Sequence, residues 1–306
     1  MGSRLRKVTT LAQVIGASVC LWSGPLVAQY LSAQDVLSTE PVEPDFVVAY
    51  GEEPEQFGNL RIPEGSGLFP VLVIIHGGCW LSFANLEHLS HFAADLSAAG
   101  VATWNIEYRR IDSPGGGWPN TFLDVANGID YLRTLQSDYP LDLNRVVVAG
   151  HSSGGHLALW AAGRSNLPAE SPLYLEAPLA IKGAVSLAGP GQLEPFRDTD
   201  NVVCGGDVID RLIGGSPEEV PNNYAAGSPI RLIPTSVPLR LITGADDPAV
   251  PPSYANAFAT AAAKVGDDVT AVTLEGAAHF ETIVPGTGVW PEVRSIILGL
   301  LGKVDQ

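Results

Sequence analysis

Short apolar runs alternate with amphipathic stretches along most of this chain. The run 69–75 is continuously apolar and rich in β-branched residues, as in strands buried on both faces of a sheet. In the stretch after it, apolar residues recur at helical spacing up to Gly100. The pattern predicts strands at 69–75, 101–106, 145–149, 181–187, 239–243 and 269–274, and helices at 86–99, 121–135, 154–162, 253–265 and 291–301. This strand–helix order predicts an α/β fold with a mostly parallel central sheet and helices on both faces.

Two stretches interrupt the alternation. Residues 29–45 carry scattered acidic residues and prolines, which predicts a linker or a loosely docked N-terminal arm. Residues 189–238 are rich in Gly, Pro and Asp, with short helical patterns at 208–213 and 222–226. We interpret this second stretch as a small cap-like insertion over one edge of the sheet, with an ordinary long loop as the alternative. One catalytic domain is therefore expected over 46–306.

The N-terminus has the pattern of an export signal. Arg4, Arg6 and Lys7 precede a mostly apolar stretch over 8–22, and the small residue Ala28 follows. The apolar stretch is shorter than the ~20 residues that a membrane-spanning helix needs. We expect a signal peptide over 1–28, a secreted or periplasmic protein, and no stable membrane association after cleavage.

Charge narrows the range of partners. The chain has 17 basic and 33 acidic residues, a formal net charge of −16, which disfavours nucleic acid and anionic lipid surfaces. There is no CxxC pattern and no His/Cys cluster that suggests a structural zinc site.

Two cysteines remain outside the predicted signal. Cys79 and Cys204 would meet an oxidising environment after export, in which a disulfide can form. The acid-rich, loop-like sequence around Cys204 gives no sign that this residue is held in place. We therefore expect two free thiols, and the alternative is a bridge that tethers the insertion to the loop of Cys79.

A candidate nucleophile lies between a predicted strand and a predicted helix. Residues 150–154 read Gly-His-Ser-Ser-Gly, which satisfies G-x-S-x-G. Small residues around a sharp strand-to-helix turn leave the hydroxyl of Ser152 exposed at the edge of the sheet. A second glycine-containing loop, His76-Gly77-Gly78-Cys79-Trp80, directly follows strand 69–75. We expect the backbone N–H groups of Gly78, Cys79 and Ser153 to form an oxyanion hole.

A serine nucleophile needs a base and an orienting acid. Of the six histidines, only His279 follows the last predicted strand, where the chain order Ser–Asp–His requires the base. Asp246 and Asp247 both lie in the loop after strand 239–243, and the pattern alone leaves the choice between them open.

Together these motifs resemble the α/β-hydrolase superfamily over residues 46–301. The loop 76–80 is similar to the HGG-x-W loop of a branch that includes kynurenine formamidase-like and feruloyl or acetyl-xylan esterase-like enzymes, and Glu107-Tyr108-Arg109-Arg110 is similar to its "YR" signature. Cys79 departs from the third glycine of the HGGG loop in related esterases. The resemblance implies that Asp247 is the acid, because G-x-x-D-x-x-V-P over 244–251 has the spacing of related hydrolases. Asp246 is then a turn or capping residue.

The resemblance implies a serine hydrolase that cleaves small carboxylic esters through an acyl-enzyme. Such an enzyme needs neither a metal nor an organic cofactor, so none is expected. Trp80, Trp118 and Phe280 lie next to the site motifs and are candidates for the substrate pocket. The alternatives are an arylformamidase acting on N-formyl-kynurenine-like amides, a prolyl-oligopeptidase-like peptidase, and a non-catalytic relative that binds a ligand.

Overall fold

The described residues form one eight-stranded sheet. The computed structural model describes residues 2, 30–197 and 204–303 of the 306-residue chain, and the predicted signal segment lies outside them except for Gly2. The strands are β1 (Phe46–Ala49), β2 (Phe57–Arg61), β3 (Phe69–Ile75), β4 (Ala102–Ile106), β5 (Leu141–His151), β6 (Gly183–Leu187), β7 (Leu239–Gly244) and β8 (Val269–Leu274). Their order is β1-β2-β4-β3-β5-β6-β7-β8. Strands β3 to β8 pair in parallel, whereas β1–β2 and β2–β4 pair antiparallel, so the predicted mostly parallel α/β sheet is confirmed.

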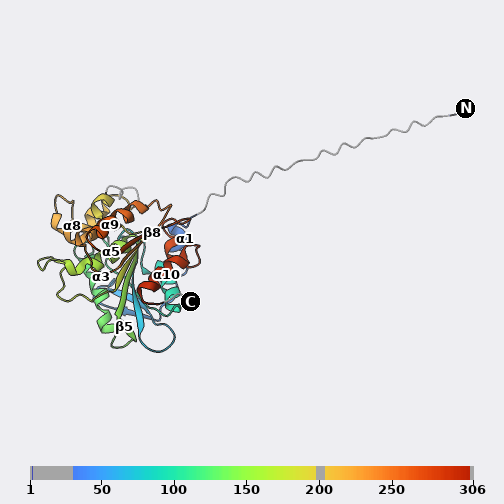
Figure 1. The fold of residues 1–306 in the computed structure, drawn as a ribbon, viewed down its shortest axis with the longest axis horizontal. Coiled ribbons are helices and arrows are strands. Elements are labelled where there is room, and N and C mark those ends of the chain that lie inside the picture. The colour runs from blue at the N-terminus through green and yellow to red at the C-terminus, as the bar shows by residue number, and fades with distance from the viewer. Residues whose placement is uncertain (1, 3–29, 198–203, 304–306) are drawn as a thin grey trace.

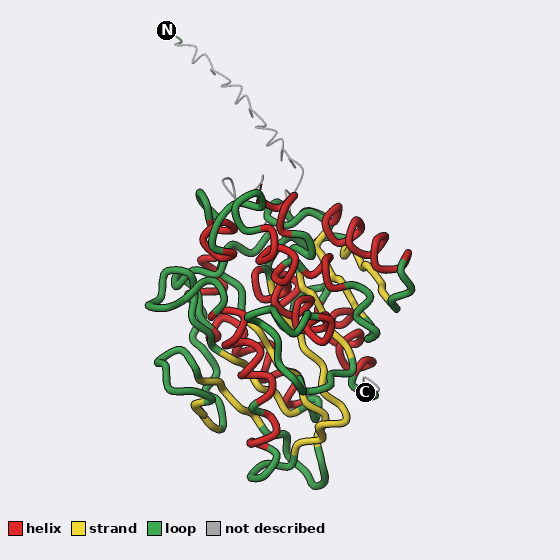
Figure 2. The backbone as a smooth tube through the Cα atoms, turned by 90° about the vertical axis from the view of Figure 1, so that its left-hand side faces the viewer, coloured by secondary structure: helices red, strands yellow, loops and turns green. Residues whose placement is uncertain are grey.

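Helices cover both faces of this sheet (Figure 1). They are α1 (Ala33–Leu37), α2 (Ser90–Ala98), α3 (Asn120–Asp130), α4 (Leu132–Leu135), α5 (Ser153–Gly163), α7 (Val208–Ile213), α8 (Pro221–Gly227), α9 (Pro252–Lys264) and α10 (Trp290–Leu300), with short 3-10 turns at Leu86–Leu89, Arg164–Asn166, Pro229–Leu232 and Glu281–Ile283. Figure 2 views the molecule from the side of α3, α5 and α8 and shows helices lying across the strands. No helix within the described ranges combines the length and the apolarity needed to cross a bilayer.

The alternation of side chains along β3 explains its continuous apolar sequence. Val71, Val73 and Ile75 pack into a core shared with α3 and α5, whereas Leu72 and Ile74 pack into a second core shared with α2 and α10. All five side chains are fully buried. A strand covered on both faces has no polar face, as the sequence predicted.

Several elements differ from the expectation. The stretch predicted as one helix over 86–99 begins as the 3-10 turn Leu86–Leu89 and continues as α2. The helix predicted over 121–135 is divided into α3 and α4 at Tyr131. The strands β1 and β2 were not predicted. Strand β1 lies at the edge of the sheet, and three of its four residues are exposed although all four are apolar; a run of only four residues is too short to distinguish a strand by its pattern.

The segment predicted as a linker or a loosely docked arm packs against the catalytic body. Val36 in α1 is 7% exposed and joins the core of α2 and α10. Farther along, the backbone N–H of Val42 donates to Ser90 Oγ at 3.1 Å, and the guanidinium of Arg61 donates to the carbonyls of Val42 and Glu43. These contacts fix the segment at Val36 and again at Val42 and Glu43.

The insertion 189–238 contains α7 and α8 and is fastened to α5. The indole N–H of Trp160 donates to the carbonyl of Ala226 at 2.9 Å, and His156 Nε2 lies 2.9 Å from the carbonyl of Gly227. Both α5 side chains are fully buried. The described part of the insertion is therefore anchored on the helix that follows Ser152.

Candidate active site

Ser152 occupies the sharp turn between β5 and α5. Its backbone has φ 54° and ψ −120°, a left-handed conformation that a residue with a side chain adopts at a cost of roughly 1–3 kcal/mol. The turn is held by hydrogen bonds from Ser152 N–H to the Leu187 carbonyl and from Gly155 N–H to the Ser152 carbonyl, both 2.8 Å. A Cβ on Gly154 would lie 2.1 Å from the carbonyl oxygen of Ile75, so this position of the motif requires glycine. The turn directs Ser152 into a cavity that it helps to line.

The loop after β3 runs directly against this serine. A Cβ on Gly77 would lie 3.1 Å from Ser152 Cβ and 2.8 Å from the carbonyl oxygen of His151, so glycine allows the close approach. Gly78 and Cys79 both have positive φ values, of 110° and 54°. Within the described part of the chain, the backbone N–H groups of Gly78, Cys79 and Ser153 have no hydrogen-bond acceptor. These donors are free to bind an oxyanion that forms next to Ser152.

Residues 107–110, which carry the "YR" motif, hold the loop 76–80 in place through contacts with His76. The ring of His76 stacks on Tyr108 with centroids 4.3 Å apart, and the hydroxyl of Tyr108 donates to the His76 carbonyl at 2.8 Å. His76 Nε2 lies 2.7 Å from Glu107 Oε1, which also accepts from Arg110 at 2.7 Å. Burial by itself raises the pKa of Glu107, but the contacts with His76 and Arg110 outweigh it and hold the pKa below its usual range. The ionised carboxylate thus anchors the oxyanion loop.

His279 and Asp247 form a buried pair. His279 Nδ1 lies 2.8 Å from Asp247 Oδ2, and the other carboxylate oxygen accepts from the backbone N–H groups of Ala249 and Val250 at 2.8 and 2.9 Å. The Asp247 side chain is fully buried. Because Nδ1 donates its proton to the carboxylate, Nε2 is left as the basic nitrogen.

The side chain of Asp246 lies at the surface, outside the pair formed by His279 and Asp247. It is exposed and accepts a hydrogen bond from the hydroxyl of Tyr30 on the N-terminal arm. Of the two aspartates in this loop, the one that contacts the histidine is Asp247, which the resemblance to related hydrolases implies as the acid.

His279 and Ser152 line the same cavity, although their side chains form no direct hydrogen bond. Such catalytic contacts are often long in the absence of substrate and shorten in the complex. His151, which sequence reasoning did not assign to the site, holds the histidine loop: its Nε2 donates to the carbonyl of His279 at 3.0 Å. Burial lowers the pKa of His151 well below its usual range, so the ring next to His279 stays neutral.

The cavity has a volume of about 420 Å³ and an apolar lining. Its lining residues are Tyr30, Leu31, Ser32, Ala33, Leu37, Gly78, Cys79, Phe83, Ala84, His88, His151, Ser152, Asp246, Pro248, Ala249, Ala278, His279 and Phe280. Five of them belong to the N-terminal arm, and no described residue of the insertion is among them. The arm, not the described part of the insertion, therefore covers this cavity.

Of the three aromatic pocket candidates, only Phe280 lines the cavity. Trp80 is 1% exposed and packs edge-on against His156. Trp118 packs edge-on against Phe122 of α3. The expectation that Trp80 and Trp118 line the substrate pocket is wrong for this cavity.

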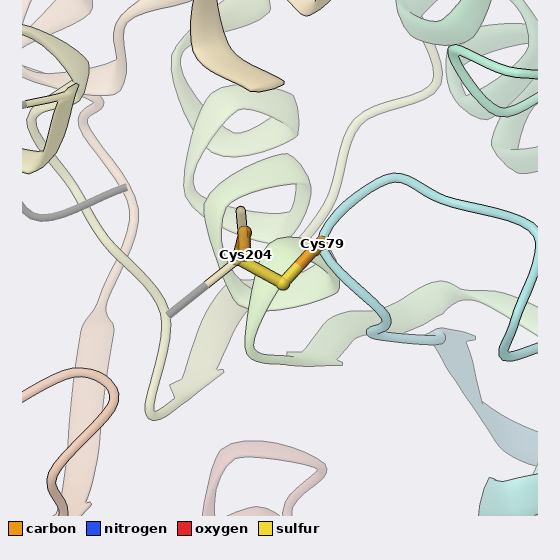
Figure 3. Close-up of a disulfide and its surroundings, with 2 residues drawn as sticks. All are labelled: Cys79 and Cys204. Carbon is orange, nitrogen blue, oxygen red and sulfur yellow. A yellow bond between two sulfur atoms is a disulfide. The ribbon is translucent and has the colours of Figure 1, made fainter. Parts of the chain in front are cut away.

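Cys79 and Cys204 form a disulfide, so the expectation of two free thiols is wrong (Figure 3). Their Cα atoms lie 5.6 Å apart across 125 residues of sequence. The insertion returns over the oxyanion loop and brings Cys204 to Cys79, a tertiary contact that has no local sequence signal. The bridge ties the proposed oxyanion donor Cys79 to the insertion.

We expect a non-reducing peptide map to contain one linked species that joins the peptides of Cys79 and Cys204 and disappears on reduction. Cys204→Ser is expected to lower the free energy of unfolding by roughly 2–4 kcal/mol, because the bridge restricts a long loop of the unfolded chain. A map with both cysteines in unlinked, alkylatable peptides would contradict the bridge.

In the described part of the chain, no group of three or more His, Cys, Asp or Glu side chains is arranged to hold a metal ion. The mostly parallel sheet, the serine at the turn after β5 and the histidine and aspartate after β8 and β7 define a member of the α/β-hydrolase superfamily. Within that superfamily the chain belongs to the BD-FAE family, whose model matches residues 60–261.

Named relatives of this chain are esterases. Esterase LipC of Mycobacterium tuberculosis is 28% identical over 264 residues, which cover 83% of this chain and 64% of LipC. The chain spans about half to two thirds of the length of the first curated relatives that it matches.

Solved structures share the fold. A truncated carbohydrate esterase from gut microbiota superposes with a TM-score of 0.70 at 22% identity, covering 89% of this chain and 99% of that one. Esterase B from Lactobacillus rhamnosis superposes with a TM-score of 0.72 at 17% identity, covering 86% of this chain and 89% of that one.

Proposed function

We propose that this protein is a serine hydrolase that cleaves small carboxylic esters through an acyl-enzyme. The observation that carries the proposal is the 2.8 Å contact between His279 Nδ1 and Asp247 Oδ2 at the cavity that Ser152 also lines. The esterase relatives support the same activity.

In this mechanism, Ser152 Oγ attacks the ester carbonyl carbon while its proton passes to His279 Nε2. Asp247 holds the imidazole and stabilises the imidazolium that forms. The carbonyl oxygen becomes an oxyanion, which accepts hydrogen bonds from Gly78, Cys79 and Ser153, each worth ~3 kcal/mol of barrier. The tetrahedral intermediate collapses, the alcohol leaves with the proton from His279, and water repeats the sequence to release the acid.

Two finer points are part of the proposal. The loop 76–80 supports a place in the branch that includes feruloyl and acetyl-xylan esterase-like enzymes, and it also makes an arylformamidase the second candidate. The basic and apolar pattern over 1–28 supports export, and a secreted or periplasmic location favours an ester over N-formyl-kynurenine, whose breakdown is intracellular.

We expect a fluorophosphonate probe to label the protein once, on the peptide that contains Ser152, as measured by mass spectrometry. A panel of p-nitrophenyl esters, feruloyl esters, acetylated xylan and N-formyl-kynurenine then ranks the substrate classes by kcat/KM. Esters are expected to lead the ranking. Faster cleavage of the formamide would make the protein an arylformamidase, and neither labelling nor turnover would indicate a non-catalytic binding protein.

A further inference from the structure

Residues 30–37 of the N-terminal arm form one wall of the cavity at Ser152. Its residues Tyr30 to Ala33 and Leu37 line the cavity. The local sequence shapes this segment: Ser32 Oγ accepts from the Asp35 N–H at 3.3 Å, and Asp35 Oδ2 accepts from the Ser32 N–H at 2.8 Å. This capping box starts α1, which places Val36 in the core and leaves Leu37 38% exposed.

The arm is anchored on the two loops that carry His279 and Asp247. The hydroxyl of Tyr30 donates to Asp246, the neighbour of Asp247. The backbone N–H of Leu31 donates to Glu281 Oε1 at 2.5 Å, while Glu281 Oε2 accepts from the N–H of Ala278 at 2.8 Å. Glu281 is 7% exposed. One buried carboxylate therefore fixes the arm and the histidine loop relative to each other.

Beside Tyr30 and Ser32, the arm presents two large apolar side chains to the cavity, and apolar side chains of other segments line it as well. Leu31 and Leu37 of the arm, with Phe83, Ala84 and Phe280, give the cavity its hydrophobic lining. Phe83 is 59% exposed, an unusually open position for a large aromatic side chain. An apolar chain bound in the cavity would remove these surfaces from water, and the gain grows with each CH₂ group buried.

The size and charge of the cavity indicate which chain fits. About 420 Å³ lies within the usual range of small-molecule sites and far exceeds the needs of an acetyl group. The carboxylate of Asp246 at its lining disfavours a second negative charge on the substrate.

We propose that the arm 30–37 is the specificity-determining wall of an acyl-binding subsite, and that it selects esters with an uncharged acyl chain of medium length, such as hexanoyl. This inference rests on the proposed esterase function. The arm acts by enclosing the acyl chain and takes no part in proton transfer.

The test compares p-nitrophenyl acetate with p-nitrophenyl hexanoate in the full chain carrying Leu31→Ala and Leu37→Ala. Both anchors of the arm use atoms other than these side chains, and alanine favours the helix at Leu37, so the arm should stay docked. We expect kcat/KM for hexanoate to fall about tenfold and that for acetate to change less than about twofold. Leu68→Ala is the matched control, because Leu68 is 59% exposed and does not line the cavity, and it should leave both values unchanged.

A second variant works in the opposite direction. Ala33→Phe places a large side chain at the same wall and is expected to exclude hexanoate while acetate is still cleaved. If the ratio of kcat/KM for hexanoate to that for acetate is unchanged in both variants, whether the two values stay constant or fall equally, the role of the arm is overturned. Absence of acetate and hexanoate turnover in the wild type would instead overturn the proposed function.

Discussion

Ser152→Ala is expected to abolish ester turnover and to leave the thermal unfolding midpoint nearly unchanged. The hydroxyl is the proposed nucleophile, and loss of this group in a triad lowers kcat on the order of 10⁶-fold. In the folded state the Ser152 hydroxyl makes no hydrogen bond to His279, and it lines a cavity, so its removal leaves no buried partner unsatisfied. The rate of p-nitrophenyl acetate hydrolysis measures turnover, and a thermal melt measures the unfolding midpoint.

Ser153→Ala is the neighbouring comparison. The proposed contribution of Ser153 is its backbone N–H, which alanine keeps, so the loss should be far smaller. Turnover by Ser152→Ala close to the wild-type rate would remove Ser152 as the nucleophile. An equal loss in both variants would contradict the assignment of the two serines.

Asp247→Asn is expected to lower kcat by about 10⁴-fold. The asparagine oxygen can still accept from the N–H groups of Ala249 and Val250, which turns its NH₂ group toward His279 Nδ1. Two donors cannot face each other, so the proton of the imidazole moves to Nε2 and the base is lost. Fold and cavity are expected to remain intact, which a thermal melt checks.

Asp246→Asn is the matched control one residue away. Asp246 is exposed, and its carboxylate accepts a hydrogen bond from the hydroxyl of Tyr30. An asparagine oxygen can accept the same bond, so acetate turnover should change little. The activities of the two variants are compared at equal protein concentration. A larger loss in Asp246→Asn than in Asp247→Asn would assign the orienting acid to Asp246.

Local patterns were enough to predict the elements that carry the site. The apolar run over β3 and the G-x-S-x-G turn mark positions where backbone geometry restricts the residues allowed, as the close contact at Gly154 shows. The edge strand β1 escaped prediction because its apolar run is only four residues long, and most of those residues are exposed in the fold.

The sequence by itself determined the order of the strands β3 to β8 and of the helices between them, and the serine at the turn after β5, because these depend on short-range periodicity or on a tight turn. The histidine after β8 followed from the chain order of a serine triad. Tertiary structure alone decided that Cys204 reaches Cys79 and that the arm at Tyr30 and Leu31 encloses the cavity. For the acid, the local pattern left two aspartates open, the resemblance to related hydrolases chose Asp247, and the fold brings that residue to His279. These contacts join residues from 32 to 250 positions apart. Which residues meet in these contacts depends on how the loops at the sheet edge pack in space. The residues next to them in the sequence do not indicate that packing.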